Sequence, residues 1–323
     1  MSVLSKPYFH DEAEAFRFVE SILWPQGPVC PHCGAMDRIT AIKPNPEKRV
    51  RLGLKKCGHC KGQFTVRMGT IFEESKLPLH KWLQAIFLMC ASKKGVSAHQ
   101  LHRTLEVTYK TAWFLTHRIR EAMRSGDLNP FGMGGATVEV DETFIGNDPD
   151  APKPRRRRGI QQMMKVVTLV ERETGRARSV VIDNYSQKDI QDVVMANLHR
   201  EAHLRTDEST MYTAVGESFR SHLAVNHGKG EYVNRQDATI HTNTIEGYFS
   251  IFKRGMRGVY QHCAKKHLHR YLAEFDFRYS MRSALGVDDQ QRTVEALKGV
   301  VGKRLTYRTA DSRREAAEGQ AQA

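Results

Sequence analysis

Val138-Glu139-Val140-Asp141-Glu142 and Arg205-Thr206-Asp207-Glu208 each place an aspartate at the end of an apolar, β-prone run. A third stretch, His241-Thr242-Asn243-Thr244-Ile245-Glu246, places a glutamate in a segment with helical periodicity. Carboxylates that a fold brings together hold hard divalent cations such as Mg²⁺ through their oxygens. Two such ions can stabilise both the attacking and the leaving oxygen of a phosphodiester. The three stretches therefore predict a cation-binding site for phosphoryl transfer.

The elements around these stretches follow an informative order. We expect strands over 137–145, 164–171 and 177–182, a helix over 186–200, a strand over 204–207, a helix over 212–219, a strand or irregular crossing over 222–225 and 231–233, and helices over 242–257 and 265–284. Thr174-Gly175 suits a turn between the second and third strands. This β-β-β-α-β-α-β-α pattern is typical of ribonuclease H-like nucleases and integrases. We expect residues 136–285 to form such an α/β catalytic domain, with a mixed sheet flanked by helices.

The predicted helix over 242–257 has a polar face suited to this chemistry. Glu246 and Lys253 are seven residues apart, about two helical turns, and therefore share a face. Asn243 lies one turn before Glu246 on the same side. A carboxylate for a cation and an ammonium for a phosphate on one face suit phosphoryl transfer. Alternation along the first strand puts Glu139 on the same face as Asp141, where we expect it to have a supporting or structural role.

Two C-x₂-C pairs, 24 positions apart, mark the N-terminal region. Four thiolates on two tight turns close a tetrahedral Zn²⁺ site, so we expect a structural zinc ribbon within residues 9–67. Gly34 and Gly58 fit the positive φ that such turns often need. The expected zinc ligands are Cys30, Cys33, Cys57 and Cys60.

Residues 77–125 read as helices over 79–92, 98–105 and 109–124, which give a helix-turn-helix outline. A purely structural interpretation, in which this region is a helical spacer, remains open. In the DNA-binding interpretation, the side chains on the last helix that reach bases or phosphates are Lys110, Thr111, Arg118 and Arg120.

The overall charge also indicates a polyanionic partner. Fifty Lys and Arg residues against 36 Asp and Glu give a net charge of +14, and a balance of this kind is common in nucleic-acid-binding proteins. The longest strongly apolar run, 85–91, is too short to span a bilayer, and residues 10–12 interrupt any signal peptide. We therefore expect a cytoplasmic, nucleoid-associated protein without a membrane partner. Further expected DNA contacts are Arg155, Arg156 and Arg157 in a basic loop, and Arg254.

Taken together, the motifs resemble those of DDE transposases from bacterial insertion sequences, in the group with an N-terminal zinc ribbon that is related to the Merlin elements. The resemblance covers nearly the whole chain except the tail. It is carried by the two cysteine pairs, by Val-Asp-Glu-Thr-Phe-Ile-Gly at 140–146, by Thr-Asp at 206–207, and by His-Thr-Asn-Thr-Ile-Glu-Gly-Tyr-Phe-Ser-Ile-Phe-Lys-Arg-Gly at 241–255.

The resemblance implies that Asp141, Asp207 and Glu246 ligate two Mg²⁺ ions, for which Mn²⁺ can substitute, and that Lys253 holds a terminal phosphate. It implies cleavage at the ends of the insertion sequence, followed by attack of the released 3′-OH on target DNA. Because the third ligand in this family can be Asn, Asn243 remains an alternative to Glu246. The implied partners are the terminal inverted repeats, the target DNA and further copies of this chain, in a homo-oligomer that binds paired ends.

We thus expect an α+β multidomain protein, with an N-terminal helix and the zinc ribbon at 9–67, the helix-turn-helix-like region at 77–125, the catalytic domain at 136–285 and a polar tail at 286–323. One rival is a zinc-ribbon and helix-turn-helix regulator that binds DNA without cutting it, which leaves the three ordered acids unexplained. Another is a ribonuclease H-like nuclease or resolvase, which hydrolyses DNA without strand transfer.

Overall fold

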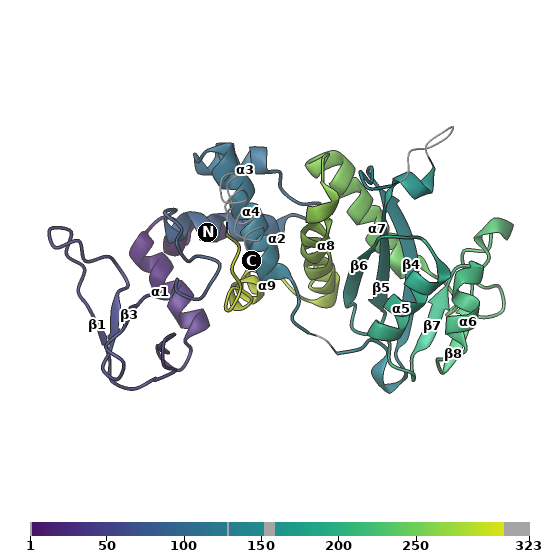
Figure 1. Ribbon diagram of the computed structural model, residues 1–323, viewed down its shortest axis with the longest axis horizontal. Coiled ribbons are helices and arrows are strands. Elements are labelled where there is room, and N and C mark those ends of the chain that lie inside the picture. The colour runs from purple at the N-terminus through teal and green to yellow at the C-terminus, as the bar shows by residue number, and fades with distance from the viewer. Residues whose placement is uncertain (1, 128, 152–158, 307–323) are drawn as a thin grey trace, which may run out of the picture. The chain divides into compact units, whose positions relative to one another are not determined.

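A computed structural model describes residues 2–127, 129–151 and 159–306 (Figure 1). The described chain divides into two compact units. The first contains residues 2–86, 98–122 and 296–306, and the second contains 87–97 and 123–295. The predicted zinc ribbon and most of the helix-turn-helix-like region therefore belong to one unit, and the catalytic domain forms the core of the other.

The N-terminal part of the first unit combines a helix with a small antiparallel sheet. Helix α1 (Glu12–Leu23) begins at Asp11, whose side chain accepts a hydrogen bond from the Glu14 backbone amide. Such a cap satisfies one of the free amides at a helix start. Three short strands follow in the order β1-β2-β3: β1 (Ile39–Ala41), β2 (Lys55–Cys57) and β3 (Gln63–Phe64).

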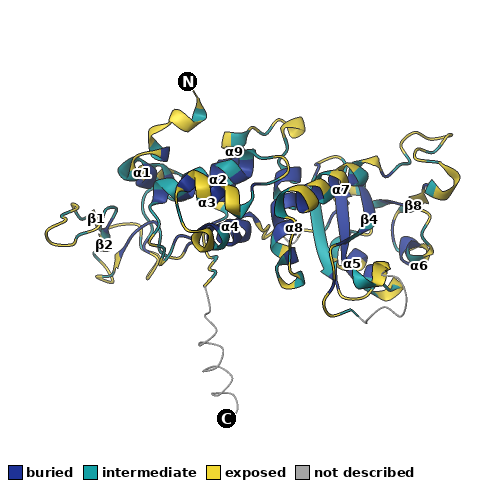
Figure 2. Cartoon of the chain, turned by 90° about the horizontal axis from the view of Figure 1, so that it is seen from above, coloured by how far each residue is buried: buried dark blue, intermediate teal, exposed yellow. Residues whose placement is uncertain are grey.

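The helices of the middle region are α2 (Leu79–Ala91), α3 (Ala98–Leu105) and α4 (Tyr109–Met123), which agree with the predicted ranges to within one residue. Residues 109–111 at the start of α4 are exposed, whereas 115–123 are all buried. Figure 2 accordingly colours much of α4 as buried. The prediction of a polar tail from 286 was wrong at its start, because Asp289–Lys298 forms helix α9 and buries Ala296 and Leu297.

The second unit is built on a five-stranded mixed sheet with the order β6-β5-β4-β7-β8 (Figure 1). The first three strands along the chain pair antiparallel, while β7 pairs parallel with β4, and β8 parallel with β7. This arrangement confirms the ribonuclease H-like fold. The strands are β4 (Thr137–Ile145), β5 (Met164–Glu171), β6 (Ala177–Ile182), β7 (His203–Thr206) and β8 (Ser221–Ala224).

Helices cover both faces of this sheet. Val138 and Val140 on β4 pack in one core with residues of α5 (Gln187–Asn197) and α6 (Thr213–Gly216). Ile145 lies in the other core, with residues of α7 (Asn243–Gly255) and α8 (Lys265–Ser280). Odd-numbered positions of β4 therefore face α7, because side chains alternate along a strand.

Two predicted elements differ from the structure. The helix expected over 212–219 is shorter and ends at Gly216, where glycine is needed because a Cβ would stand 2.1 Å from the His222 ring. The strand expected near 231–233 is reduced to one bridge between Val233 and His241. Short 3₁₀ helices occupy Val3–Ser5, Pro7–Phe9, Met133–Gly135, Ile160–Gln162, Thr210–Tyr212, His227–Lys229 and Ser283–Leu285, and a π-helical turn, Met256–Tyr260, follows α7.

Candidate active site and zinc centre

The two aspartates lie just beyond the pairing of two adjacent parallel strands. Glu139 of β4 lies opposite Arg205 of β7. Two residues further along the chain, Asp141 lies in the middle of β4 and Asp207 directly follows the last residue of β7. One oxygen of each carboxylate is held by the backbone: Asp141 Oδ1 accepts from the Glu142 amide at 2.7 Å, and Asp207 Oδ1 accepts from the Ser209 amide at 3.0 Å. These bonds orient both carboxylates.

The electrostatics of Asp141 show that the other predicted residues are close to it. Burial, and after it the neighbouring charge of Asp207, raises the pKa of Asp141 to about 7. The Glu142 amide and the Lys253 ammonium lower it, and the Glu246 carboxylate raises it. Asp207, Glu246 and Lys253 therefore lie within electrostatic reach of Asp141. Carboxylates that repel one another fit a divalent cation, whose charge removes the repulsion.

Helix α7 supplies the remaining predicted groups. Glu246 lies in its first turn, and 41% of its side chain is exposed. Lys253 follows two turns later, with Nζ 5.7 Å from the centre of the Phe249 ring. Asn243 is the first residue of α7 and is exposed. A carboxylate and an ammonium therefore do share one side of α7, as the spacing predicts.

Sequence reasoning missed His227, which lies beside the third carboxylate. Its Nδ1 is 3.5 Å from Glu246 Oε1, and its Nε2 is 3.2 Å from Thr242 Oγ1. The turn that carries His227 is held by Glu208, whose carboxylate accepts hydrogen bonds from the backbone amides of His227 and Gly228. A lone histidine in an irregular segment has no periodicity that could have marked it.

Glu142, beside Asp141 in sequence, is a further carboxyl group at this end of the sheet. Burial, and after it the adjacent Asp141 charge, raises its pKa to about 8. Tyr212 is fully buried nearby, and burial, with the Glu142 charge second, raises its pKa well above its ordinary value. This side of the strand end is therefore poorly hydrated, which strengthens charge interactions at Asp141.

Six of the eight predicted DNA contacts fall into three groups. Lys110 and Thr111 are exposed at the start of α4, where the recognition helix of a helix-turn-helix contacts bases. Arg254 is exposed on α7, and its Nε donates to the Ser250 carbonyl at 2.9 Å. Arg155, Arg156 and Arg157 lie outside the described residues.

Arg118 and Arg120 are corrections to the prediction. Arg118 is buried, donates to the Glu73 carbonyl at 2.6 Å and has its guanidinium 5.5 Å from the centre of the Trp82 ring. Arg120 is 2% exposed and donates to Thr116 Oγ1 at 3.1 Å. Both side chains fill the interior of the first unit, so neither is placed to contact DNA.

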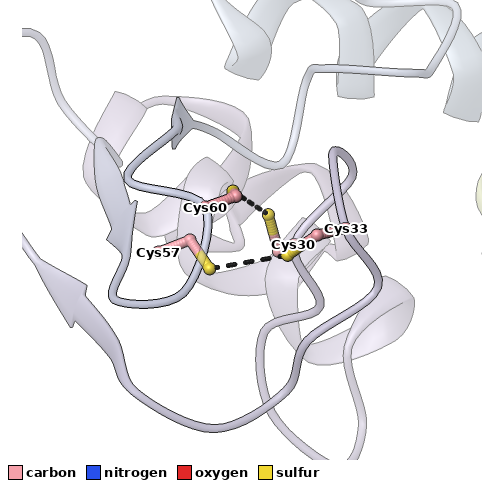
Figure 3. A group of neighbouring side chains, drawn as sticks. All are labelled: Cys30, Cys33, Cys57 and Cys60. Atoms are coloured by element: carbon pink, nitrogen blue, oxygen red, sulfur yellow. Dashed lines mark hydrogen bonds between the residues drawn. The ribbon is translucent and has the colours of Figure 1, made fainter.

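The four cysteines form a compact cluster in which all sulfurs lie within 4.8 Å of one another (Figure 3). Cys30 and Cys60 Sγ are 3.6 Å apart, and Cys33 and Cys57 Sγ are 3.7 Å apart. A tetrahedron with Zn–S bonds of about 2.3 Å has edges of about 3.8 Å. The measured separations therefore match four-coordinate zinc, as the spacing predicts.

The backbone of the two turns differs in one detail from the expectation. Gly34 has φ +75°, whereas Gly58 is not in the left-handed region, and Lys61, the residue after the last cysteine, has φ +62°. Gly58 is needed for another reason, because a Cβ there would stand 2.8 Å from the Arg38 carbonyl oxygen. The two turns thus use the same left-handed position, after their second cysteine.

Comparisons with known proteins agree with both centres. Residues 133–280 match the ISXO2-like transposase domain, and residues 10–63 match the transposase zinc-ribbon domain. The chain is 27% identical over 295 residues to an uncharacterized protein in transposable element ISH50 of Halobacterium salinarum, over 84% of this chain and 91% of that protein. Within the described residues, every helix is too short or too polar to cross a membrane. The chain belongs to the DDE transposases of insertion sequences that carry an N-terminal zinc ribbon.

Proposed function

We propose that this transposase catalyses Mg²⁺-dependent cleavage at the ends of its insertion sequence and strand transfer of those ends into target DNA. The observation that carries the proposal is that Asp141, just beyond the parallel pairing of β4 with β7, has Asp207 at the end of β7 and Glu246 and Lys253 of α7 within electrostatic reach. A regulator that only binds DNA has no use for three acids gathered in this way.

The donor set fits Mg²⁺ because all three predicted ligands are carboxylates, the hard oxygen donors that this ion prefers. The carboxylate oxygens of the three acids do not all lie within 4.8 Å of one another, whereas the four cysteine sulfurs do. Mn²⁺ has the same ligand preference and can substitute.

Each residue has a distinct proposed role. Asp141 would hold both ions, and Asp207 and Glu246 would each hold one of them. When bound, the ions stabilise the charge that develops on the attacking and leaving oxygens. Lys253 binds a terminal phosphate oxygen through its ammonium group. Asn243, one turn before Glu246, is the alternative third ligand.

Binding of the terminal inverted repeats is assigned to the exposed start of α4, with Lys110 and Thr111 as contacts. The net charge of +14 supports a phosphate-rich partner. The thiolate cluster holds structural Zn²⁺ and fixes the ribbon. Coupled cleavage of two ends requires two active sites, so we propose a homo-oligomer on paired ends.

The test uses supercoiled plasmid that carries the element's own ends. With Mg²⁺, the wild-type chain should cut at those ends, while Asp141→Asn and Asp207→Asn should bind the ends and leave them intact. Asp192→Asn, at an exposed position on α5, is the matched control and should cut normally. Cleavage that survives in both active-site variants would overturn the assignment.

A further inference from the structure

Glu139 on β4 is a fully buried carboxylate with partners from two other parts of the second unit. Its Oε1 accepts from Arg172 Nε at 2.6 Å and lies 3.4 Å from His241 Nδ1. Its Oε2 accepts from the backbone amide of Ile245, in the first turn of α7, at 2.8 Å. Glu139 therefore joins the central strand directly to the start of the helix that carries Glu246.

Arg172, which follows β5, extends this connection. Its Nη1 donates to the Thr239 carbonyl and its Nη2 to the His241 carbonyl, both at 2.6 Å. One guanidinium thus holds the Glu139 carboxylate and the segment that leads into α7. The fork geometry of arginine suits several simultaneous contacts of this kind, and lysine cannot reproduce them.

The energetics favour one position for the start of α7. The first amides of a helix have no partner within the helix and carry partial positive charge, so a carboxylate there is stabilising. The buried Glu139 carboxylate depends on hydrogen-bond donors and on the Arg172 guanidinium, because water does not reach it. Removing the Glu139 charge would leave the guanidinium without its counter-ion. The contact is therefore both strong and specific to this placement of the helix.

The hydrogen bond between Glu139 and Ile245 lies close in sequence to the proposed metal ligands on both β4 and α7. Glu139 is two residues before Asp141 on the same face of β4, and Ile245 is the residue before Glu246. The hydrogen bond between Glu139 and Ile245 thus directly links the strand that carries one ligand to the helix that carries another. Displacement of α7 would move Glu246 and Asn243 together relative to Asp141.

We propose that Glu139 is a positioning residue of the cation site: through Ile245, and with Arg172, it sets the separation between Asp141 and the third ligand on α7. The proposal rests on the proposed function, in which these residues hold the cations. It does not depend on whether Glu246 or Asn243 is the third ligand, because Glu139 fixes the turn that carries both.

The test measures cation binding directly, without catalysis. Mn²⁺ is titrated into the full-length, zinc-loaded chain, and free Mn²⁺ is followed by its electron paramagnetic resonance signal. Glu139→Gln keeps the size of the side chain and removes its charge. Residues that orient metal ligands typically change affinity roughly 10–100-fold when replaced, so we expect Mn²⁺ binding at least tenfold weaker. Affinity for element-end DNA should stay within a factor of about two.

Glu274→Gln is the matched control. Glu274 is also 0% exposed and pairs with an arginine, Arg278, in the same unit. It should lose a similar amount of thermal stability and leave Mn²⁺ affinity unchanged. Arg172→Lys, which keeps a cation near Glu139 but loses the carbonyl contacts, should weaken Mn²⁺ binding by an intermediate factor, and it serves if Glu139→Gln does not fold.

The outcomes separate this proposal from the proposed function. Asp141→Asn is included as a reference and should abolish the strongest Mn²⁺ binding. If wild type and Asp141→Asn bind Mn²⁺ alike, the proposed cation site itself is wrong. If Asp141→Asn behaves as expected but Glu139→Gln binds as wild type does, or Glu274→Gln weakens binding equally, Glu139 is structural and the positioning role is refuted.

Discussion

Replacing Asp141 by asparagine should make the cation-free chain more stable at neutral pH while it removes the proposed catalytic function. Burial and the nearby Asp207 charge raise the pKa of Asp141 from 3.8 to about 7. Between these values the folded chain keeps a proton that the unfolded chain has released. Stability therefore falls as pH rises from about 4 to about 7, and it stays low above that range.

The magnitude follows from the shift. One pKa unit corresponds to about 1.4 kcal/mol, so a rise from 3.8 to about 7 costs up to about 4 kcal/mol above pH 7. Asparagine carries no titrating proton and keeps a side-chain oxygen that can accept the hydrogen bond of the Glu142 amide, as Asp141 Oδ1 does at 2.7 Å. The stability advantage of Asp141→Asn should thus grow across this window and then level off.

The assay is urea unfolding of zinc-loaded full-length chain between about pH 5 and pH 8, without added Mg²⁺, followed by hydrogen exchange of peptides from β4 and β5. Tryptophan fluorescence is unsuitable because Trp24, Trp82 and Trp113 all lie in the other unit. Added Mg²⁺ should stabilise wild type and not the variant, since a ligand stabilises only a state that binds it. A variant whose stability difference from wild type does not change with pH refutes the reasoning.

Three further predictions concern the other parts of the chain. Removing zinc with a chelator should change the fluorescence of Trp24, because its ring packs edge-on against Phe64, which is buried beside the cysteines. Unchanged fluorescence would argue against a structural metal. Arg118→Ala should destabilise the first unit by about 1–3 kcal/mol, because a buried carbonyl loses its hydrogen-bond donor. Lys110→Ala should leave stability intact and weaken binding to DNA, and the salt dependence of binding should fall by about one if Lys110 contacts a phosphate. Equal stability of the two variants would contradict the burial argument. Glu246→Gln should lose nearly all cleavage activity, while Asn243→Ala keeps a measurable rate, and the reverse result makes asparagine the third ligand.

The sheet of the second unit could be predicted from local sequence. Strands β4, β5 and β6 have the predicted bounds because each is a β-prone run closed by turn residues. The turn after β5 uses Gly175 at φ +70°. Order and parallel pairing then follow from the ribonuclease H-like pattern, and with them the approach of Asp141 and Asp207. The cysteine cluster was equally accessible, because its ligand spacing is local.

What could not be predicted depends on contacts between distant segments. Arg118 and Arg120 are charged residues on an amphipathic helix, which favours exposure. Only the tertiary structure reveals their burial, as the packing of Trp82 and the Glu73 carbonyl around Arg118 shows. The link between Glu139 and Ile245 spans 106 residues and leaves no trace in either local pattern. Tertiary structure decides both cases.

The central claim is most directly tested by strand transfer from a pre-cleaved end. A duplex that carries the element's terminal repeat with a free 3′-OH is incubated with wild-type chain, Mg²⁺ and supercoiled target plasmid, and joined products are sequenced. The account predicts covalent joining of the 3′ end to the plasmid, lost with Asp207→Asn and lost with a 3′-deoxy end. Wild-type protein that cuts the DNA in the presence of Mg²⁺ yet never joins the end would contradict it and identify a nuclease.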